Sequence, residues 1–207
     1  MRHLPELFGN NRAWAAGRVA EDPEYFRRLC GLQAPRYLWI GCADSRVPAN
    51  QIVGLEPGEL FVHRNVGNVF DPSDANAVSV LQYAVEALGV SNVIVCGHYE
   101  CGGVQAAFGG PLKPPLEGWI DHFRRVRQAH RDELDALPER DAQWRRLCEL
   151  NVAAQVASVC STDVVTSAWA RGKRLIVHGW ICDLADGLLR DLDLSIDGPA
   201  GCGSAEA

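Results

Sequence analysis

The chain has 207 residues, of which 47% are hydrophobic and 22% charged, a composition typical of one globular domain with a buried core. Its net charge of −6 argues against nucleic-acid binding, and the most basic segment, HFRRVRQAHRDE (122–133), mixes in acids and is interpreted as a solvated helix face. No apolar run reaches the ~20 residues that span a bilayer, and the first residues lack the apolar core of a signal peptide, so we expect a cytoplasmic protein.

The predicted elements alternate between helices and strands. The first thirty residues predict two short helices, the second opened by Asp22-Pro23. A periodic stretch predicts a helix between Asp74, as its N-cap, and Gly89, as its C-terminal glycine. Further helices are expected over 119–130 and 141–170. Apolar runs without alternation, typical of parallel strands covered on both faces, predict four strands at 36–42, 59–64, 92–97 and 174–180.

This alternation indicates βαβ units. We therefore predict an α/β fold with a mostly parallel, four-stranded central sheet flanked by helices, plus an edge strand near Leu192–Ile196. The chain divides into an N-terminal helical arm (1–34), an α/β domain (35–195) and a flexible tail (196–207), which lacks the periodicity of a packed element.

Two short polar motifs each follow a predicted strand. GCADSRVP places Cys42, Asp44 and Arg46 at alternate positions, and CGHYECGG contains His98 and Cys101. Because ligands gather beyond the carboxyl ends of parallel strands, we expect Cys42 to meet His98 and Cys101 there. Two thiolates and one imidazole are three of the four ligands of a tetrahedral zinc site, which leaves the open position that a catalytic zinc needs. The six other cysteines lack this spacing and are interpreted as ordinary thiols in a reducing compartment.

These motifs resemble those of the zinc-dependent β-class carbonic anhydrases of the bacterial type. CADSR matches the C-x-D-x-R motif of that family and GHYECGG its H-x-x-C motif. The resemblance continues through GLEPGELFVHRNVGN, SVLQYAV, LCELNV and SAWARG, and covers nearly the whole chain except its C-terminal end. It implies reversible hydration of carbon dioxide to bicarbonate and a proton by a zinc-bound hydroxide, in a zinc-binding catalytic domain whose metal ligands are Cys42, His98 and Cys101.

The resemblance also implies roles for residues around the metal. Asp44 would orient the hydroxide, and Arg46 would hold Asp44 through paired hydrogen bonds. If that pair broke, Asp44 would become the fourth zinc ligand of a closed site. The N-terminal arm would embrace a second subunit in a homodimer or homotetramer. The implied substrate pocket consists of Gln33, Phe61, Val66, Tyr83, Gly102 and Gly103.

A subset of the family binds inhibitory bicarbonate at a second site built from tryptophan, arginine and tyrosine. Trp39 and Arg64 occupy the first two of these positions here, but the third is Ile181, which has no hydroxyl group. We therefore predict that regulation by bicarbonate is weakened or altered.

Two other functions stay open from the sequence. A hydrolase of carbon disulfide or carbonyl sulfide on the same scaffold would use the same metal and differ mainly in how substrate enters. A noncatalytic zinc protein would be closed permanently by Asp44, but a purely structural ligand needs no Arg46 to hold it away from the metal. Dinucleotide binding is not supported, because no G-x-G-x-x-G follows the first strand.

Overall fold

The computed structural model describes residues 3–31 and 33–204. The chain divides into two compact units, with the boundary between Ala34 and Pro35. The first unit contains helices α1 (Pro5–Glu21) and α2 (Tyr25–Gly31). The ring of Trp14 packs edge-on against that of Phe26, with their centroids 5.5 Å apart, which joins the two helices. Two helices were predicted here, but α1 is long rather than short, and neither helix contains a buried residue.

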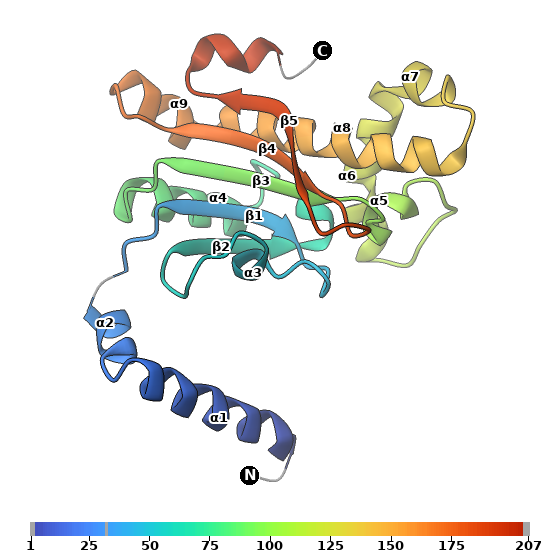
Figure 1. The fold of residues 1–207 in the computed structure, drawn as a ribbon. Coiled ribbons are helices and arrows are strands. Elements are labelled where there is room, and N and C mark those ends of the chain that lie inside the picture. The colour runs from blue at the N-terminus through green and yellow to red at the C-terminus, as the bar shows by residue number, and fades with distance from the viewer. Residues whose placement is uncertain (1–2, 32, 205–207) are drawn as a thin grey trace. The chain divides into compact units, whose positions relative to one another are not determined.

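The second unit is built on a five-stranded sheet with the order β2-β1-β3-β4-β5 (Figure 1). Strands β1 (Tyr37–Cys42), β2 (Leu60–Asn65), β3 (Asn92–His98) and β4 (Ile176–Cys182) are parallel. Strand β5 (Leu189–Ile196) pairs antiparallel with β4 at the edge. This arrangement confirms the predicted α/β fold, and the edge strand begins three residues earlier than expected.

Helices follow the first three parallel strands, β1, β2 and β3, whereas β4 leads directly into β5. Their bounds are α3 (Ala49–Ile52), α4 (Ala75–Gln82), α5 (Gly102–Ala106), α6 (Leu116–Ala129), α7 (Arg131–Asp135), α8 (Arg140–Cys160) and α9 (Asp163–Ala170). Short 3₁₀ turns cover Val66–Asn68 and Pro199–Ser204, and a π-helical turn, Tyr83–Ala87, continues α4. The Asp74 side chain accepts a hydrogen bond from the Asn76 backbone N–H, and Gly89 has a φ of 72°, so both predicted helix boundaries are confirmed.

The largest cluster of buried side chains lies between the sheet and helices α4, α8 and α9. Leu38 and Ile40 of β1, Val93 and Val95 of β3, and Val152 of α8 are buried within it. A second cluster packs α5, α6 and α7 against α8 at the carboxyl ends of the strands. In residues 3–31 and 33–204, no helix combines the length and hydrophobicity that a membrane-spanning segment requires.

Two expectations from the sequence were wrong in detail. The helix predicted over 141–170 is two helices, because the chain turns at Thr162, whose hydroxyl caps α9 by accepting a hydrogen bond from the Val165 backbone N–H. The range predicted as a flexible tail, 196–207, includes residues that belong to defined elements. Ile196 is buried and pairs with Val177, and residues 199–204 form a 3₁₀ turn; residues 205–207 lie outside the described part of the chain.

Removing the Thr162 cap should destabilise the domain. We expect Thr162→Ala to lower the free energy of unfolding by about 1 kcal/mol, because the first turn of α9 loses a side-chain acceptor in a buried position. In thermal denaturation followed by circular dichroism this is a drop of roughly 2–4 °C. Ser79→Ala, at an exposed position of α4, is the control and should change the midpoint by less than about 1 °C. Equal midpoints for the two variants would contradict the assigned cap.

Candidate metal centre

The ends of two adjacent parallel strands bring three potential ligands together. Cys42 is the last residue of β1, and His98 is the last residue of β3. The chain then turns through Glu100, whose φ is +60°, and Cys101 directly precedes the first residue of α5. Because β1 and β3 are hydrogen-bonded neighbours, this turn returns Cys101 to the end of β1. The predicted convergence of the two motifs is confirmed.

The geometry of the three side chains fits a metal ion. A sulfur or nitrogen atom from each of Cys42, His98 and Cys101 lies within 4.8 Å of the others, and all three residues are buried. The two Sγ atoms are 3.9 Å apart. Two thiolates bound to one tetrahedral zinc at about 2.3 Å each are separated by about 3.8 Å. The chain therefore holds the sulfurs near the separation that zinc requires.

The imidazole of His98 is oriented as a metal ligand. Its Nδ1 lies 2.8 Å from the backbone oxygen of Tyr99. A carbonyl oxygen only accepts, so Nδ1 carries the proton and Nε2 carries a lone pair. This Nε2 is buried and has no hydrogen-bond partner among the described residues. A buried nitrogen with a free lone pair is costly unless something binds it, and a cation between the two sulfurs would do so.

The two thiols differ in their surroundings. Cys42 Sγ accepts hydrogen bonds from the backbone N–H groups of Gly67 (3.3 Å) and Asp44 (3.4 Å). Together with the neighbouring Cys101 thiol and His98, these donors lower the pKa of Cys42 to about 4. Contact with the Cys42 sulfur and burial raise the pKa of Cys101. A bound divalent cation offsets this repulsion, since it stabilises both thiolates.

Asp44 is held at the edge of this cluster by Arg46. Arg46 Nε donates to Asp44 Oδ1 (3.0 Å), and its Nη2 donates to Asp44 Oδ2 (2.8 Å). The Arg46 guanidinium lowers the pKa of Asp44 below its ordinary value, so the carboxylate is ionised at neutral pH. Asp44 Oδ2 is 3.8 Å from His98 Nε2. The carboxylate therefore lies beside the three ligands while its two oxygens are paired with Arg46.

Arg64 supports the same loop from β2. Its Nε donates to the backbone oxygen of Cys42 at 2.6 Å, and its Nη2 donates to that of Asp44 at 2.5 Å. Trp39, at the predicted regulatory position, is buried in β1, and its Nε1 has no partner in the described chain. Ile181 is completely buried in β4. Arg64 thus fixes the first ligand loop through backbone contacts.

The residues predicted to line a substrate pocket form two contacting pairs. The rings of Phe61 and Tyr83 are 5.9 Å apart between centroids. Val66 packs on Gly103, where an added Cβ would come within 2.7 Å of Val66 Cγ1, so only glycine fits there. Gly102 opens α5 and is exposed. Gln33 is exposed in the N-terminal unit.

Helix α8 supplies three supporting residues that sequence reasoning missed. Trp144 Nε1 donates to the backbone oxygen of Cys101 at 3.1 Å. Glu149 accepts a 2.5 Å hydrogen bond from the Tyr99 hydroxyl, and the Arg145 guanidinium lies 3.7 Å from the centroid of the Tyr99 ring. Burial and the contact with Glu149 raise the pKa of Tyr99 to about 12, so it stays a donor. No local sequence signal marks these contacts, because their partners lie more than forty residues apart.

A comparison with known proteins identifies the family. A family model described as carbonic anhydrase matches residues 37–189. A carbonic anhydrase of Emericella nidulans is 47% identical over 193 residues, covering 93% of this chain and 85% of that protein. The structure of a Coccomyxa β-carbonic anhydrase in complex with acetazolamide superposes with a TM-score of 0.93 at 41% identity, covering 99% of this chain and 92% of that one. The chain belongs to the β-carbonic anhydrase family.

Other members of the β-carbonic anhydrase family support this identification. A carbonic anhydrase of Pseudomonas aeruginosa is 36% identical over 179 residues, covering 82% of this chain and 79% of that protein. One of two tetrameric β-carbonic anhydrases from Sordaria macrospora has a TM-score of 0.88 at 37% identity, covering 92% of this chain and 97% of that one. As a carbonic anhydrase, this chain catalyses the reversible hydration of carbon dioxide to bicarbonate.

Loss of the Tyr99 hydroxyl should weaken metal retention. In Tyr99→Phe the loop between His98 and Cys101 loses its hydrogen bond to Glu149, and we expect zinc to dissociate severalfold faster to a competing chelator. Tyr37→Phe is the control, because it removes a tyrosine hydroxyl at the start of β1, outside the loop between His98 and Cys101. Identical dissociation rates for Tyr99→Phe and the wild type would show that the contact with Glu149 does not position the ligand loop.

Proposed function

We propose that this carbonic anhydrase works with one zinc ion held by Cys42, His98 and Cys101, and that the fourth coordination position is open to solvent. The observation that carries this proposal is the pair of sulfurs 3.9 Å apart beside a buried imidazole nitrogen that lacks a partner. When bound there, zinc supplies Lewis acidity that makes water a nucleophile.

The chain's own residues then orient the reactants. The Asp44 carboxylate accepts a hydrogen bond from the reacting water and so directs a lone pair of its oxygen at carbon dioxide. Arg46 keeps this carboxylate ionised and holds both of its oxygens, which opposes its movement onto the metal. This pairing favours an open, catalytic site over one closed by Asp44. Val66, which packs on Gly103, supplies part of the apolar wall that a small nonpolar gas needs. Phe61 and Tyr83 contact each other, and Phe61 lies beside Leu38, four residues before Cys42 along β1.

We also propose that Gln33 completes the pocket of a neighbouring subunit in a homodimer or homotetramer. The tetrameric Sordaria relative supports an assembly. The α1 helix supports it too, since Leu7, Phe8, Trp14 and Val19 are all at least 44% exposed and form an apolar surface for a partner. Sedimentation velocity should give at least a dimer, and a monomer at micromolar concentration would contradict this proposal.

Weakened bicarbonate regulation is a further part of the proposal. The second bicarbonate site would include Trp39 and Arg64, but its third position is Ile181, which has no hydroxyl group to donate. Arg64 also donates its hydrogen bonds to the backbone oxygens of Cys42 and Asp44. Inhibition by bicarbonate should therefore follow a simple hyperbola, and cooperative inhibition would contradict this.

A cytoplasmic location is proposed because Cys42 and Cys101 must stay reduced; it predicts that cell fractionation recovers the enzyme with cytoplasmic markers.

Substitutions at the site separate metal binding from catalysis. In stopped-flow hydration of carbon dioxide, Cys101→Ala should lose both zinc and activity, because the site loses a thiolate ligand. Asp44→Asn should keep stoichiometric zinc and lose on the order of 100-fold in kcat, because the orienting acceptor changes.

Wild-type activity should rise into the alkaline range, since two thiolates cancel the charge of Zn²⁺ and leave bound water less acidic than in a three-histidine site.

Two results would contradict these roles. Full activity of Asp44→Asn would remove Asp44 from the reaction, and a zinc-replete wild type inactive with carbon dioxide would favour the closed, noncatalytic alternative. The same preparations should be assayed with carbon disulfide and carbonyl sulfide, where faster turnover than with carbon dioxide would favour the hydrolase alternative.

A further inference from the structure

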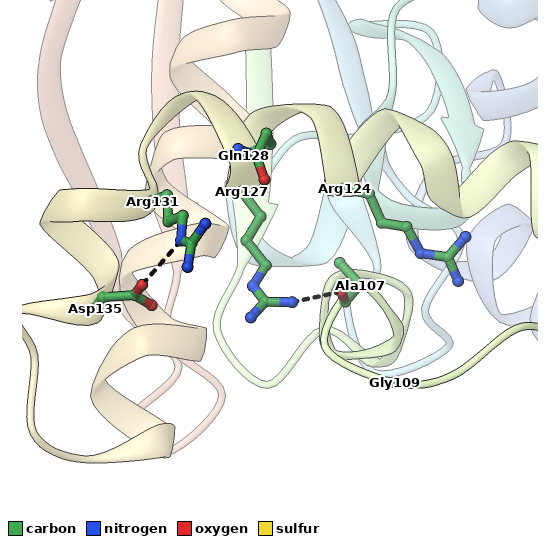
Figure 2. Close-up of a pocket in the computed structure, with 7 residues that line it drawn as sticks. All are labelled: Ala107, Gly109, Arg124, Arg127, Gln128, Arg131 and Asp135. Carbon is green, nitrogen blue, oxygen red and sulfur yellow. Dashed lines mark hydrogen bonds and ion pairs between the residues drawn. The ribbon is translucent and has the colours of Figure 1, made fainter.

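A cleft lined by arginines lies between the α6–α7 segment and the loop that follows α5. None of its lining residues belongs to the metal centre. Its volume is about 540 Å³, within the size range of small-molecule pockets. Arg124, Arg127 and Arg131 line it from one face of the helical segment, and the loop after α5 forms the facing wall at Ala107 (Figure 2). This is the basic segment 122–133, which sequence analysis interpreted as an ordinary solvated face.

The three arginines are not equally neutralised. Arg124 donates to Glu117 and Asp121 at 2.8 Å each, so its charge is compensated. Arg131 is paired with Asp135 at 3.2 Å, but both side chains are more than half exposed, and such a pair contributes little stability. Arg127 has no carboxylate within ion-pairing distance in the described parts of the chain.

Arg127 has unused donors directed along the cleft. One of its nitrogens donates to the backbone oxygen of Ala107 at 3.2 Å (Figure 2). Its guanidinium also lies 4.6 Å from the centroid of the Phe108 ring. A guanidinium has five N–H donors, so most remain available. Arg140 lies over the same ring at 4.1 Å, donates to the Phe108 backbone oxygen and also lacks an acidic partner among the described residues.

This arrangement concentrates uncompensated positive charge in a chain whose net charge is −6. Like charges that lie close together on a helical surface repel each other, and of Arg124, Arg127 and Arg131 it is Arg127 that has no carboxylate partner among the described residues to offset this cost. An anion in the cleft would remove that cost. It would meet Arg127 directly, would compete with the exposed Asp135 for Arg131, and would experience the field of Arg140.

We propose that this cleft binds a small phosphorylated anion. A phosphate group carries about 1.5–2 negative charges and accepts paired hydrogen bonds from a guanidinium, whereas one carboxylate brings a single charge. Within the cleft, Arg127 is uncompensated and Arg131 is weakly paired, and Arg140 on the same Phe108 ring adds a third positive charge nearby, which together match a ligand of two or more charges. A compound with two phosphate groups fits both the charge and the volume of the cleft.

Isothermal titration of the zinc-loaded full chain tests this proposal. Propane-1,3-diyl bisphosphate is the main probe, and inorganic phosphate and acetate at equal ionic strength are comparators. We expect the bisphosphate to bind tightest and acetate to show no binding. The double variant Arg127→Gln/Arg131→Gln should weaken bisphosphate binding by about tenfold or more, the loss of one to two charged hydrogen bonds.

A matched control removes the same charge elsewhere. Arg171→Gln/Arg174→Gln replaces two exposed arginines outside the cleft and should keep the wild-type affinity within about twofold. Arg131→Gln alone should weaken binding without changing the thermal midpoint, because the ion-pair partner of Arg131 within the described residues is the exposed Asp135; this separates a binding effect from unfolding. Carbon dioxide hydration without added anion should be equal in all variants, so this test is independent of the proposed zinc mechanism.

Several results would overturn the proposal. Equal weakening in the control pair would show a general charge effect rather than a site. Unchanged affinity in the double variant, together with inhibition of hydration by the same anion, would place binding at the metal centre. Absence of measurable binding by the wild type, or binding of acetate as tight as that of the bisphosphate, would equally contradict a phosphate site.

Discussion

The site depends on the close approach of two sulfur atoms, one at the end of β1 and the other in the turn between β3 and α5. Cys42 Sγ and Cys101 Sγ are 3.9 Å apart in a buried position, where two thiolates repel each other unless a cation lies between them. The surrounding groups are arranged to stabilise a thiolate and to bind a cation. Backbone N–H groups point at Cys42, and the His98 nitrogen that faces the sulfurs has no other partner in the described structure. The arrangement of donor atoms at this edge of the sheet is therefore that of a site able to hold a metal ion.

The turn that carries two of the ligands is held at each backbone carbonyl. His98 donates to the oxygen of Tyr99, Arg46 to that of Glu100 at 3.4 Å, and Trp144 to that of Cys101. Arg46 therefore has two tasks, since it orients Asp44 and contacts the loop between the other ligands. A rigid loop keeps the three ligand atoms at the distances that a tetrahedral ion demands, and long helix α8 provides that rigidity.

The sequence predicted the sheet and the convergence of the three potential metal ligands because both signals are local. Apolar runs mark the strands, and Cys42 and His98 occupy their last positions. Contacts between distant segments carry no such signal, which is why the hydrogen bond between Tyr99 and Glu149 was missed. The end of α8 was missed because apolar periodicity continues across Thr162, whose capping role depends on a turn. Likewise, only the structure shows that Arg124 pairs with Glu117, seven residues away, and that no carboxylate in the described parts of the chain pairs with Arg127.

X-ray absorption at the zinc edge of the purified enzyme reports the ligands of the ion itself. We expect one zinc per chain with two sulfur neighbours at about 2.3 Å and two nitrogen or oxygen neighbours at about 2.0–2.1 Å, one of them an imidazole. A shell of four sulfurs, a shell without sulfur, or a protein that purifies without stoichiometric metal would contradict it.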